Sequence, residues 1–200
     1  MIISMSDILC VTNRTLCKED LLTRIERVVS ARPAGIILRE KDLPEEAYET
    51  LARQVLGLCR DRGVRCILHG FVPAALHLQA DAIHLPLPVL RQMPEGEKAR
   101  FRTLGASCHS VADAREAQRL GCTYITAGHI FATDCKKGLE PRGLAFLQDV
   151  CRSVEIPVYA IGGISPEKMP SVRAAGAAGA CVMSGLMTCP DPRRLLEELQ

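Results

Sequence analysis

Residues 157–165 read Pro-Val-Tyr-Ala-Ile-Gly-Gly-Ile-Ser, and this stretch contains the unit from which the fold is predicted. The run 157–161 is apolar nearly throughout, which is typical of a parallel strand buried on both faces. Two bare glycines then allow a tight turn, and Ser165 followed by Pro166 is a helix-start signal. The stretch therefore predicts a strand that passes directly into a helix.

The same strand-then-helix unit recurs along the chain. Short apolar runs that predict strands occur eight times, at Asp7–Thr12, Gly35–Arg39, Arg65–His69, Ala82–Leu85, Arg102–Ser107, Tyr124–Ala127, Pro157–Ile161 and Ala180–Met183. Amphipathic stretches that predict helices lie at Glu19–Ala31, Pro44–Arg62, Ser110–Arg119, Gly143–Val150, Pro166–Ala175 and Asp191–Glu198. The segments after the third and fourth strands are too short for a clear helix pattern.

Eight alternations of strand and helix predict an α/β protein with a closed (β/α)₈ architecture, the TIM barrel. With 200 residues it is a minimal barrel, and residues 1–200 are expected to form a single domain. An open doubly wound sheet has the same alternation of elements. However, the first strand is not followed by the Gly-x-Gly-x-x-Gly turn of dinucleotide-binding sheets.

The composition excludes several classes of protein. Apolar residues make up 48% of the chain and charged residues 24%, which is enough apolar material for a sizeable core. The net charge of +2 is too small to predict a nucleic-acid surface, and no apolar run approaches the ~20 residues of a membrane helix. The ten cysteines include no Cys-x-x-Cys pair, so buried thiols of a reduced, cytoplasmic protein are expected.

The turns after the last two predicted strands are rich in small residues. In TIM barrels, active sites lie at the C-terminal ends of the strands, and the seventh and eighth strand ends commonly bind phosphate. Bare glycines let backbone N–H groups approach an anion. We therefore expect phosphate at Gly162, Gly163, Ser184 and Gly185. Tight turns between strand and helix would alone explain the same glycines.

The segment Gly128–Gly138, after the sixth predicted strand, is long, polar and bounded by glycines. Loops of this kind over a barrel mouth often act as functional lids. Its two lysines, Lys136 and Lys137, could meet an anionic substrate. A solvated surface loop is the alternative interpretation.

At this loop the chain resembles the thiamine phosphate synthase superfamily, and within it the TenI-type thiazole tautomerases. The resemblance covers nearly the whole chain and is strongest from Ser107 to Gly185. The motifs that carry it are Leu38-Arg39-Glu40-Lys41, Ala82-Ile83-His84-Leu85, Ser107-Cys108-His109-Ser110, Gly128–Gly138, Ala160–Ile164 and Met183-Ser184-Gly185.

Two departures from the synthase pattern concern a metal. The resemblance implies that a synthase joins a pyrimidine diphosphate to a thiazole phosphate with Mg²⁺ held by aspartates after strands three and four. Here the first place reads Leu68-His69-Gly70-Phe71 and the second reads residues 84–89, His-Leu-Pro-Leu-Pro-Val. Neither place has a carboxylate, and Mg²⁺ requires oxygen ligands. The sequence therefore argues against synthase activity and predicts no metal.

A third departure favours a tautomerase. Where the synthase pattern has Gly-Pro after strand six, this chain has Gly128-His129. In the resembling tautomerases this histidine moves the proton, so His129 is the predicted catalytic residue. The implied substrate is the carboxythiazole phosphate made by thiazole synthase, and the implied product is its aromatic tautomer. Such an isomerase needs a base that titrates near neutrality, and no cofactor.

Other predicted contacts follow from the strand ends. Arg39 could hold the substrate carboxylate, since guanidinium suits a planar two-oxygen partner, although a rim ion pair with Glu40 is the alternative. The remaining expected substrate contacts lie at Lys41, His69, Ser107, Thr133 and Lys136. His69 stands where the synthase keeps an asparagine that contacts substrate, so it could touch the ligand or only fill space.

Two alternatives to the tautomerase stay open. One is thiamine phosphate synthase, which requires Mg²⁺-dependent turnover of the pyrimidine diphosphate. The other is a non-catalytic regulator, a barrel that has lost its activity but still binds the thiazole phosphate. The resemblance also implies a homodimer, while nothing in the sequence predicts a nucleic-acid or membrane partner.

Overall fold

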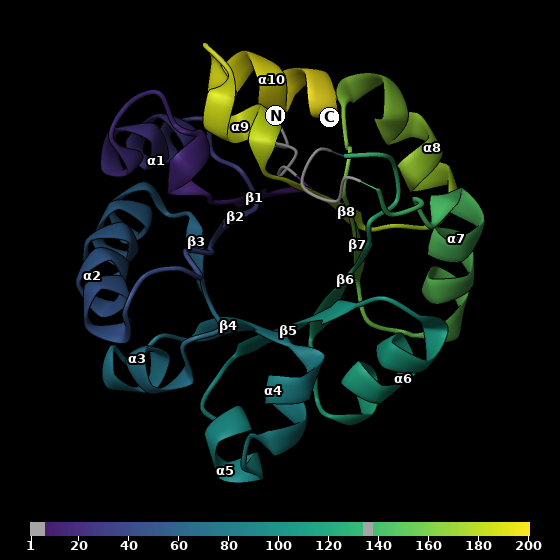
Figure 1. Ribbon diagram of the computed structural model, residues 1–200, viewed down its shortest axis with the longest axis horizontal. Helices are drawn as coiled ribbons and strands as arrows, with labels where there is room; N and C mark the ends of the chain where they lie inside the picture. Colours follow the sequence, from purple (N-terminus) through teal and green to yellow (C-terminus); the bar gives the residue numbers. More distant parts are fainter. Residues whose placement is uncertain (1–6, 134–137) are drawn as a thin grey trace.

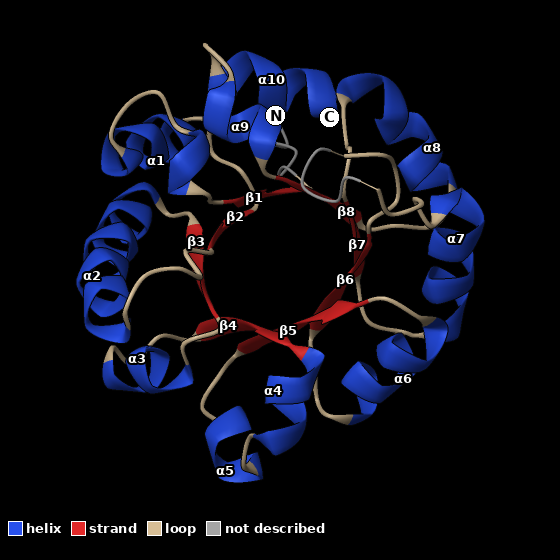
Figure 2. Ribbon diagram, in the orientation of Figure 1, coloured by secondary structure: helices blue, strands red, loops and turns tan. Residues whose placement is uncertain are grey.

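The chain is a closed barrel of eight parallel strands in this computed structural model, which describes residues 7–133 and 138–200. Figure 1 and Figure 2 show the strands as an inner ring with the helices outside it. The strands are β1 (Ile8–Val11), β2 (Gly35–Leu38), β3 (Arg65–His69), β4 (Ala82–Pro86), β5 (Thr103–Cys108), β6 (Tyr124–Gly128), β7 (Val158–Ile161) and β8 (Gly179–Val182). Each strand lies within about one residue of its predicted bounds.

The ring closes because β1 pairs with both β2 and β8. Ile8 lies opposite Ala180, and Leu9 lies opposite both Cys181 and Gly35. This pairing confirms the predicted TIM barrel. It also excludes the open doubly wound sheet, in which the edge strands have no partner.

Helices cover the outer face of the barrel between successive strands. The longer ones are α1 (Leu21–Ser30), α2 (Glu45–Arg62), α6 (Val111–Arg119), α7 (Gly143–Ser153) and α10 (Pro192–Leu199). The shorter ones are α3 (Val72–His77), α4 (Leu87–Gln92), α5 (Glu95–Lys98), α8 (Met169–Ala174) and α9 (Ser184–Thr188). The helix predicted over 166–175 begins as a 3₁₀ turn, Pro166–Lys168, before α8.

Buried apolar side chains form two layers. Because successive strand residues point to opposite faces, Ile8 and Cys10 pack against the helices, whereas Leu9 and Val11 point into the barrel. None of the nine described cysteines forms a disulfide. Within the same described ranges, no helix is long and apolar enough to cross a bilayer.

Candidate active site

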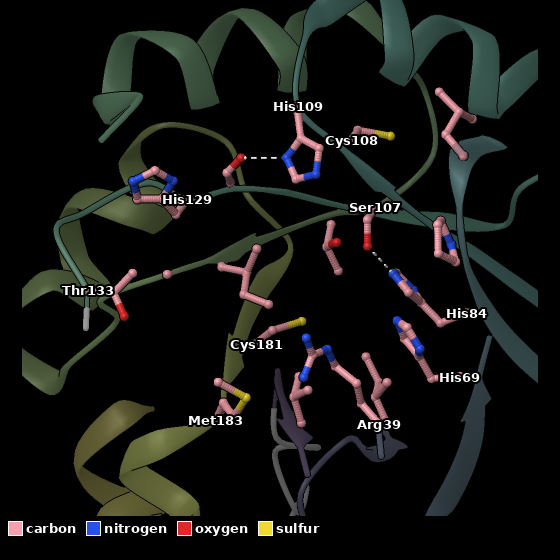
Figure 3. A pocket seen from close by; sticks show the side chains of 18 of the residues that line it. Arg39, His69, His84, Ser107, Cys108, His109, His129, Thr133, Cys181 and Met183 are labelled. Atoms are coloured by element: carbon pink, nitrogen blue, oxygen red, sulfur yellow. Dashed lines mark hydrogen bonds between the residues drawn. The ribbon is translucent and has the colours of Figure 1, made fainter. Parts of the chain in front are cut away.

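A cavity of about 540 Å³ opens at the C-terminal ends of the strands. Its walls include residues from every strand, and its volume suits a ligand of the size of a small cofactor. Figure 3 shows side chains converging on it from several strand ends. The predicted site residues that line it are Arg39, Lys41, His69, Ser107, His129, Thr133, Gly162, Gly163 and Ser184. Gly185 lies one residue behind the lining, and Lys136 falls outside the described residues.

Arg39 is directed to this cavity and not to Glu40. The buried carboxylate of Glu40 accepts a hydrogen bond from Thr12 Oγ1 at 2.7 Å and pairs with Arg14 at 3.3 Å. Among the described residues, no carboxylate forms an ion pair with the Arg39 guanidinium. The alternative of a rim ion pair between Arg39 and Glu40 is therefore wrong, because Glu40 turns toward β1.

Two neutral histidines form the wall of the cavity at β3 and β4. The rings of His69 and His84 stack with centroids 5.6 Å apart. Burial, with the nearby charges of Arg39 and Lys41, lowers the pKa of His69 to about 4. Burial, with His69 beside it, lowers the pKa of His84 to about 3. Both imidazoles are therefore uncharged at neutral pH and offer a ligand hydrogen bonds rather than positive charge.

Two more imidazoles follow the next two strands, β5 and β6. His109 Nδ1 is 2.9 Å from the carbonyl oxygen of Gly128, so Nδ1 carries a proton and donates it to that oxygen. His129 Nε2 is 3.3 Å from the carbonyl oxygen of Leu139. Asp113, which accepts the backbone N–H of His109 at 2.8 Å, supplies a carboxylate to the cavity wall.

The sequence interpretation missed His109 and Asp113 as cavity residues. His109 could have been assigned to the cavity from the sequence, because it directly follows β5, where the barrel rule places sites. Asp113 could not, since it belongs to the first turn of α6 and reaches the cavity only through the angle at which that helix leaves β5.

The turn after β7 requires glycine for two reasons. Gly162 and Gly163 have φ values of 99° and 65°, which L side chains rarely adopt. A Cβ on Gly162 would lie 2.4 Å from Cβ of His129, and one on Gly163 would lie 2.4 Å from the carbonyl oxygen of Ala132. Lys168 Nζ donates to the carbonyl oxygen of Gly163 at 2.7 Å and steadies the turn. These glycines thus bring the β6 and β7 loops together at the cavity.

The hydroxyl of Ser107 belongs to a buried hydrogen-bonded chain. His84 Nε2 is 2.9 Å from Ser107 Oγ, and His84 Nδ1 is 2.9 Å from the Tyr124 hydroxyl. Gly105, on β5 between His84 and Tyr124, leaves the room for this hydrogen-bonded chain. A Cβ there would lie 2.3 Å from the Tyr124 ring and 2.6 Å from His84 Nδ1.

We expect Gly105→Ala to lower the free energy of unfolding by about 1–3 kcal/mol, the range for overpacked cores. Urea unfolding measures the change. Gly57→Ala is the matched control: Gly57 lies in α2, and a Cβ added there would have nothing within 4 Å, so alanine should stabilise by about 0.5–1 kcal/mol. Equal effects of the two substitutions would contradict the tight contact at Gly105.

The cavity does not fit a Mg²⁺ site of the kind that the resemblance implies. Mg²⁺ prefers several oxygen ligands, yet the ends of β3 and β4 present His69, Gly70 and Pro86. Asp113 is the one carboxylate among the described residues of the lining. Nowhere in 7–133 and 138–200 do three or more His, Cys, Asp or Glu side chains group as a metal site.

Comparisons with known proteins agree on one family. The family model described as thiamine monophosphate synthase matches residues 8–186. The chain is 36% identical over 189 residues to a thiamine-phosphate synthase of Roseiflexus sp. strain RS-1, covering 91% of this chain and 78% of the relative. A putative thiamine-phosphate synthase of Geobacter sulfurreducens is 35% identical over 180 residues, covering 87% and 83%.

A solved structure gives the same result. The thiamine phosphate pyrophosphorylase from Pyrococcus furiosus superimposes with a TM-score of 0.84 and 29% sequence identity. The match covers 98% of this chain and 94% of that chain. The likeness therefore extends to the whole barrel.

These relatives overturn the predicted activity. The chain was expected to be an isomerase, a thiazole tautomerase, because of the missing aspartates and His129, but the relatives are named for a synthase, which is a transferase. The matched residues span nearly all of the barrel. The chain belongs to the thiamine monophosphate synthase family.

Proposed function

We propose that the chain is a transferase of the thiamine-phosphate synthase type, which joins a pyrimidine diphosphate to a thiazole phosphate and releases diphosphate. The observation that carries the proposal is the match of residues 8–186 to the thiamine monophosphate synthase family. The cavity supports it, because Arg39 and Lys41 place two cations where an anionic ligand would enter. Both substrates are anions, so this wall suits them.

The two substrates are assigned to different parts of the cavity. The phosphate of the thiazole substrate lies against the turns of Gly162, Gly163 and Ser184, with Gly185 behind, where glycines let backbone N–H groups approach an anion. The diphosphate lies toward Arg39 and Lys41 at the end of β2, in place of the carboxylate first expected at Arg39. The predicted contacts His69, Ser107 and Thr133 then surround the two rings.

His129 stays the predicted catalytic residue, in a different role. It lies at the end of β6, across the barrel from β2 and beside Gly162, where an added Cβ would lie 2.4 Å from Cβ of His129. This place is next to the turns assigned to the thiazole phosphate and remote from the diphosphate at the end of β2. In the proposal, His129 therefore orients the thiazole phosphate for its reaction with the pyrimidine substrate.

The proposed contacts with thiazole phosphate involve no metal ligand. Because the ends of β3 and β4 offer no carboxylate, we expect EDTA to change the dissociation constant for thiazole phosphate by less than about twofold. Calorimetric titration with and without EDTA measures this. A tenfold weakening by EDTA, restored by added Mg²⁺, would contradict the assignment of the phosphate to the glycine turns.

A second candidate function is binding of thiazole phosphate without turnover. The specific observation in its favour is the carboxylate-free edge at β3 and β4, where the resemblance places the ligands of Mg²⁺ in a synthase. A barrel that retains the anion-binding turns but has lost this metal edge would act as a sensor of the thiazole phosphate.

Steady-state assays of product formation distinguish the two candidates. The purified chain is mixed with the pyrimidine diphosphate and thiazole phosphate, with and without Mg²⁺, and thiamine phosphate is quantified. Formation of product that His129→Ala slows at least about tenfold supports the transferase. Binding of thiazole phosphate with no product under either condition would reject the transferase in favour of the sensor.

The homodimer and the cytoplasmic location stay predictions of the resemblance and of cysteine usage. Analytical ultracentrifugation of the purified chain tests the first, and a monomer at all concentrations would contradict it.

A further inference from the structure

Three side chains from neighbouring strands form one hydrogen-bonded chain that ends at the cavity. Tyr124 on β6, His84 on β4 and Ser107 on β5 are joined by two contacts of 2.9 Å each. Figure 3 shows the contact between His84 and Ser107 and the ring of His69 beside His84. The inner end, at Tyr124, is fully inside the barrel, where that residue is 5% exposed. The outer end, at Ser107, faces the ligand space.

The buried tyrosine hydroxyl determines the direction of the chain. Within the described residues, the only hydrogen-bond partner of the Tyr124 hydroxyl is His84 Nδ1. If Nδ1 carried the imidazole proton, the tyrosine O–H would be a buried donor with no acceptor, which is costly. Tyr124 therefore donates to Nδ1. A neutral His84 then carries its proton on Nε2 and donates it to Ser107 Oγ.

We propose that Tyr124 and His84 are positioning residues that hold the Ser107 hydroxyl as a hydrogen-bond donor to the ligand. His84 occupies a lone pair of Ser107 Oγ, which leaves the serine proton to be donated into the cavity. No other described group accepts it. Ser107 thus favours ligands that present a bare acceptor, such as an aromatic ring nitrogen or a carbonyl oxygen, over those that present an amino or hydroxyl donor.

The acceptor belongs to the body of the ligand and not to its phosphate. β5 lies across the barrel from β1 and β8, as Figure 1 shows, so Ser107 is remote from the turn at Ser184. The nearest neighbours of Ser107 are uncharged: His84 contacts its hydroxyl, and Thr126 lies opposite it on β6. An uncharged acceptor suits this wall better than a phosphate, which finds cations and backbone N–H groups elsewhere in the cavity.

The same direction excludes another interpretation of the geometry. A serine, a histidine and a third group at these distances resemble a nucleophile activated by a base. A base must accept the serine proton, but Nε2 of His84 already carries a proton when Tyr124 donates to Nδ1. Burial also lowers the pKa of His84 to about 3, so the imidazolium that a base must become is disfavoured. Ser107 is therefore a binding group.

The direction of the chain is tested by NMR of the side-chain nitrogens of His84 in the intact protein. Long-range ¹H–¹⁵N spectra distinguish a protonated ring nitrogen from a bare one. We expect a protonated Nε2 and a bare Nδ1 in the wild type and in Tyr159→Phe. This control removes a neighbouring hydroxyl that is not part of the hydrogen-bonded chain. In Tyr124→Phe, the pattern of His84 should change. A protonated Nδ1 in the wild type would overturn the proposal.

The role of Ser107 is tested by titration with two probes, thiazole phosphate and inorganic phosphate. The choice of thiazole phosphate rests on the proposed function. We expect Ser107→Ala and Tyr124→Phe to weaken the binding of thiazole phosphate about 3- to 10-fold, whereas Tyr159→Phe should bind it nearly as the wild type does. The binding of inorganic phosphate should be unaffected by all three substitutions. Equal weakening of both probes by Ser107→Ala would overturn the assignment of a ring acceptor.

The NMR experiment and the titration test the inference and the proposed function separately. If thiazole phosphate failed to bind the wild type, the proposed function would fail. The NMR result would still decide the direction of the chain, because it is measured without ligand.

Discussion

Arg39→Ala is expected to lower kcat/KM for the pyrimidine diphosphate about 10- to 100-fold. The guanidinium lines the cavity and, in the described parts of the chain, has no carboxylate partner to release before it meets an anion. Hydrogen bonds between charged groups contribute about 1.5–3 kcal/mol each, and each 1.4 kcal/mol is a factor of ten. Steady-state kinetics with varied diphosphate substrate measures the loss. Arg39→Lys should recover part of it, because lysine keeps the charge but not the paired donors.

Arg91→Ala is the matched control for this loss. Arg91 also lines the cavity, but its guanidinium is held by Glu116 through two hydrogen bonds of 2.7 Å. Its removal should change kcat/KM by less than about threefold, since exposed ion pairs contribute little. Equal losses from the two substitutions would mean that overall positive charge matters at the mouth and that Arg39 has no specific contact.

The two stacked histidines are expected to make the barrel labile to acid. Their folded pKa values are about 4 for His69 and about 3 for His84, below the value of about 6.5 of an unfolded histidine. Below about pH 6.5 the unfolded chain therefore binds more protons than the folded one, so stability falls as the pH falls. Between about pH 7 and pH 5 the two together should cost about 3–4 kcal/mol, which urea unfolding at both pH values measures.

His84→Gln isolates the contribution of His84 from that of titrating carboxylates. Its loss of stability between the same two pH values should be about 2 kcal/mol smaller than that of the wild type. His77→Gln, which removes an exposed imidazole on α3, should behave as the wild type. The same pH dependence in His84→Gln and the wild type would show that folding does not lower the pKa of His84.

The barrel itself was predictable because its strands are buried on both faces. Runs such as Tyr124–Ala127 are mostly apolar, and the structure extends this one only to Gly128. Closure was predictable from the count of eight units. The short helices α3 and α4 were not, because a stretch of six residues is less than two turns and shows no clear periodicity.

Most of the cavity was predictable for a different reason. The rule that barrel sites lie at the C-terminal strand ends placed Arg39, Ser107 and Gly163 correctly at its wall. The hydrogen-bonded chain from Tyr124 through His84 to Ser107 was not predictable. Tyr124 is at the start of β6 and meets His84 only through the stagger of the strands. The activity was mistaken because the missing aspartates and His129 were given more weight than the likeness of the whole chain.

Phosphorus-31 NMR of one reaction mixture tests most directly whether the protein catalyses the proposed transferase reaction. The spectrum follows the thiazole phosphate, the pyrimidine diphosphate and released diphosphate in the same sample. We expect one diphosphate released for each thiazole phosphate converted to a new phosphate ester, with slower conversion in Arg39→Ala. Diphosphate released without conversion of the thiazole phosphate, or two unchanged substrates beside the folded protein, would contradict the transferase.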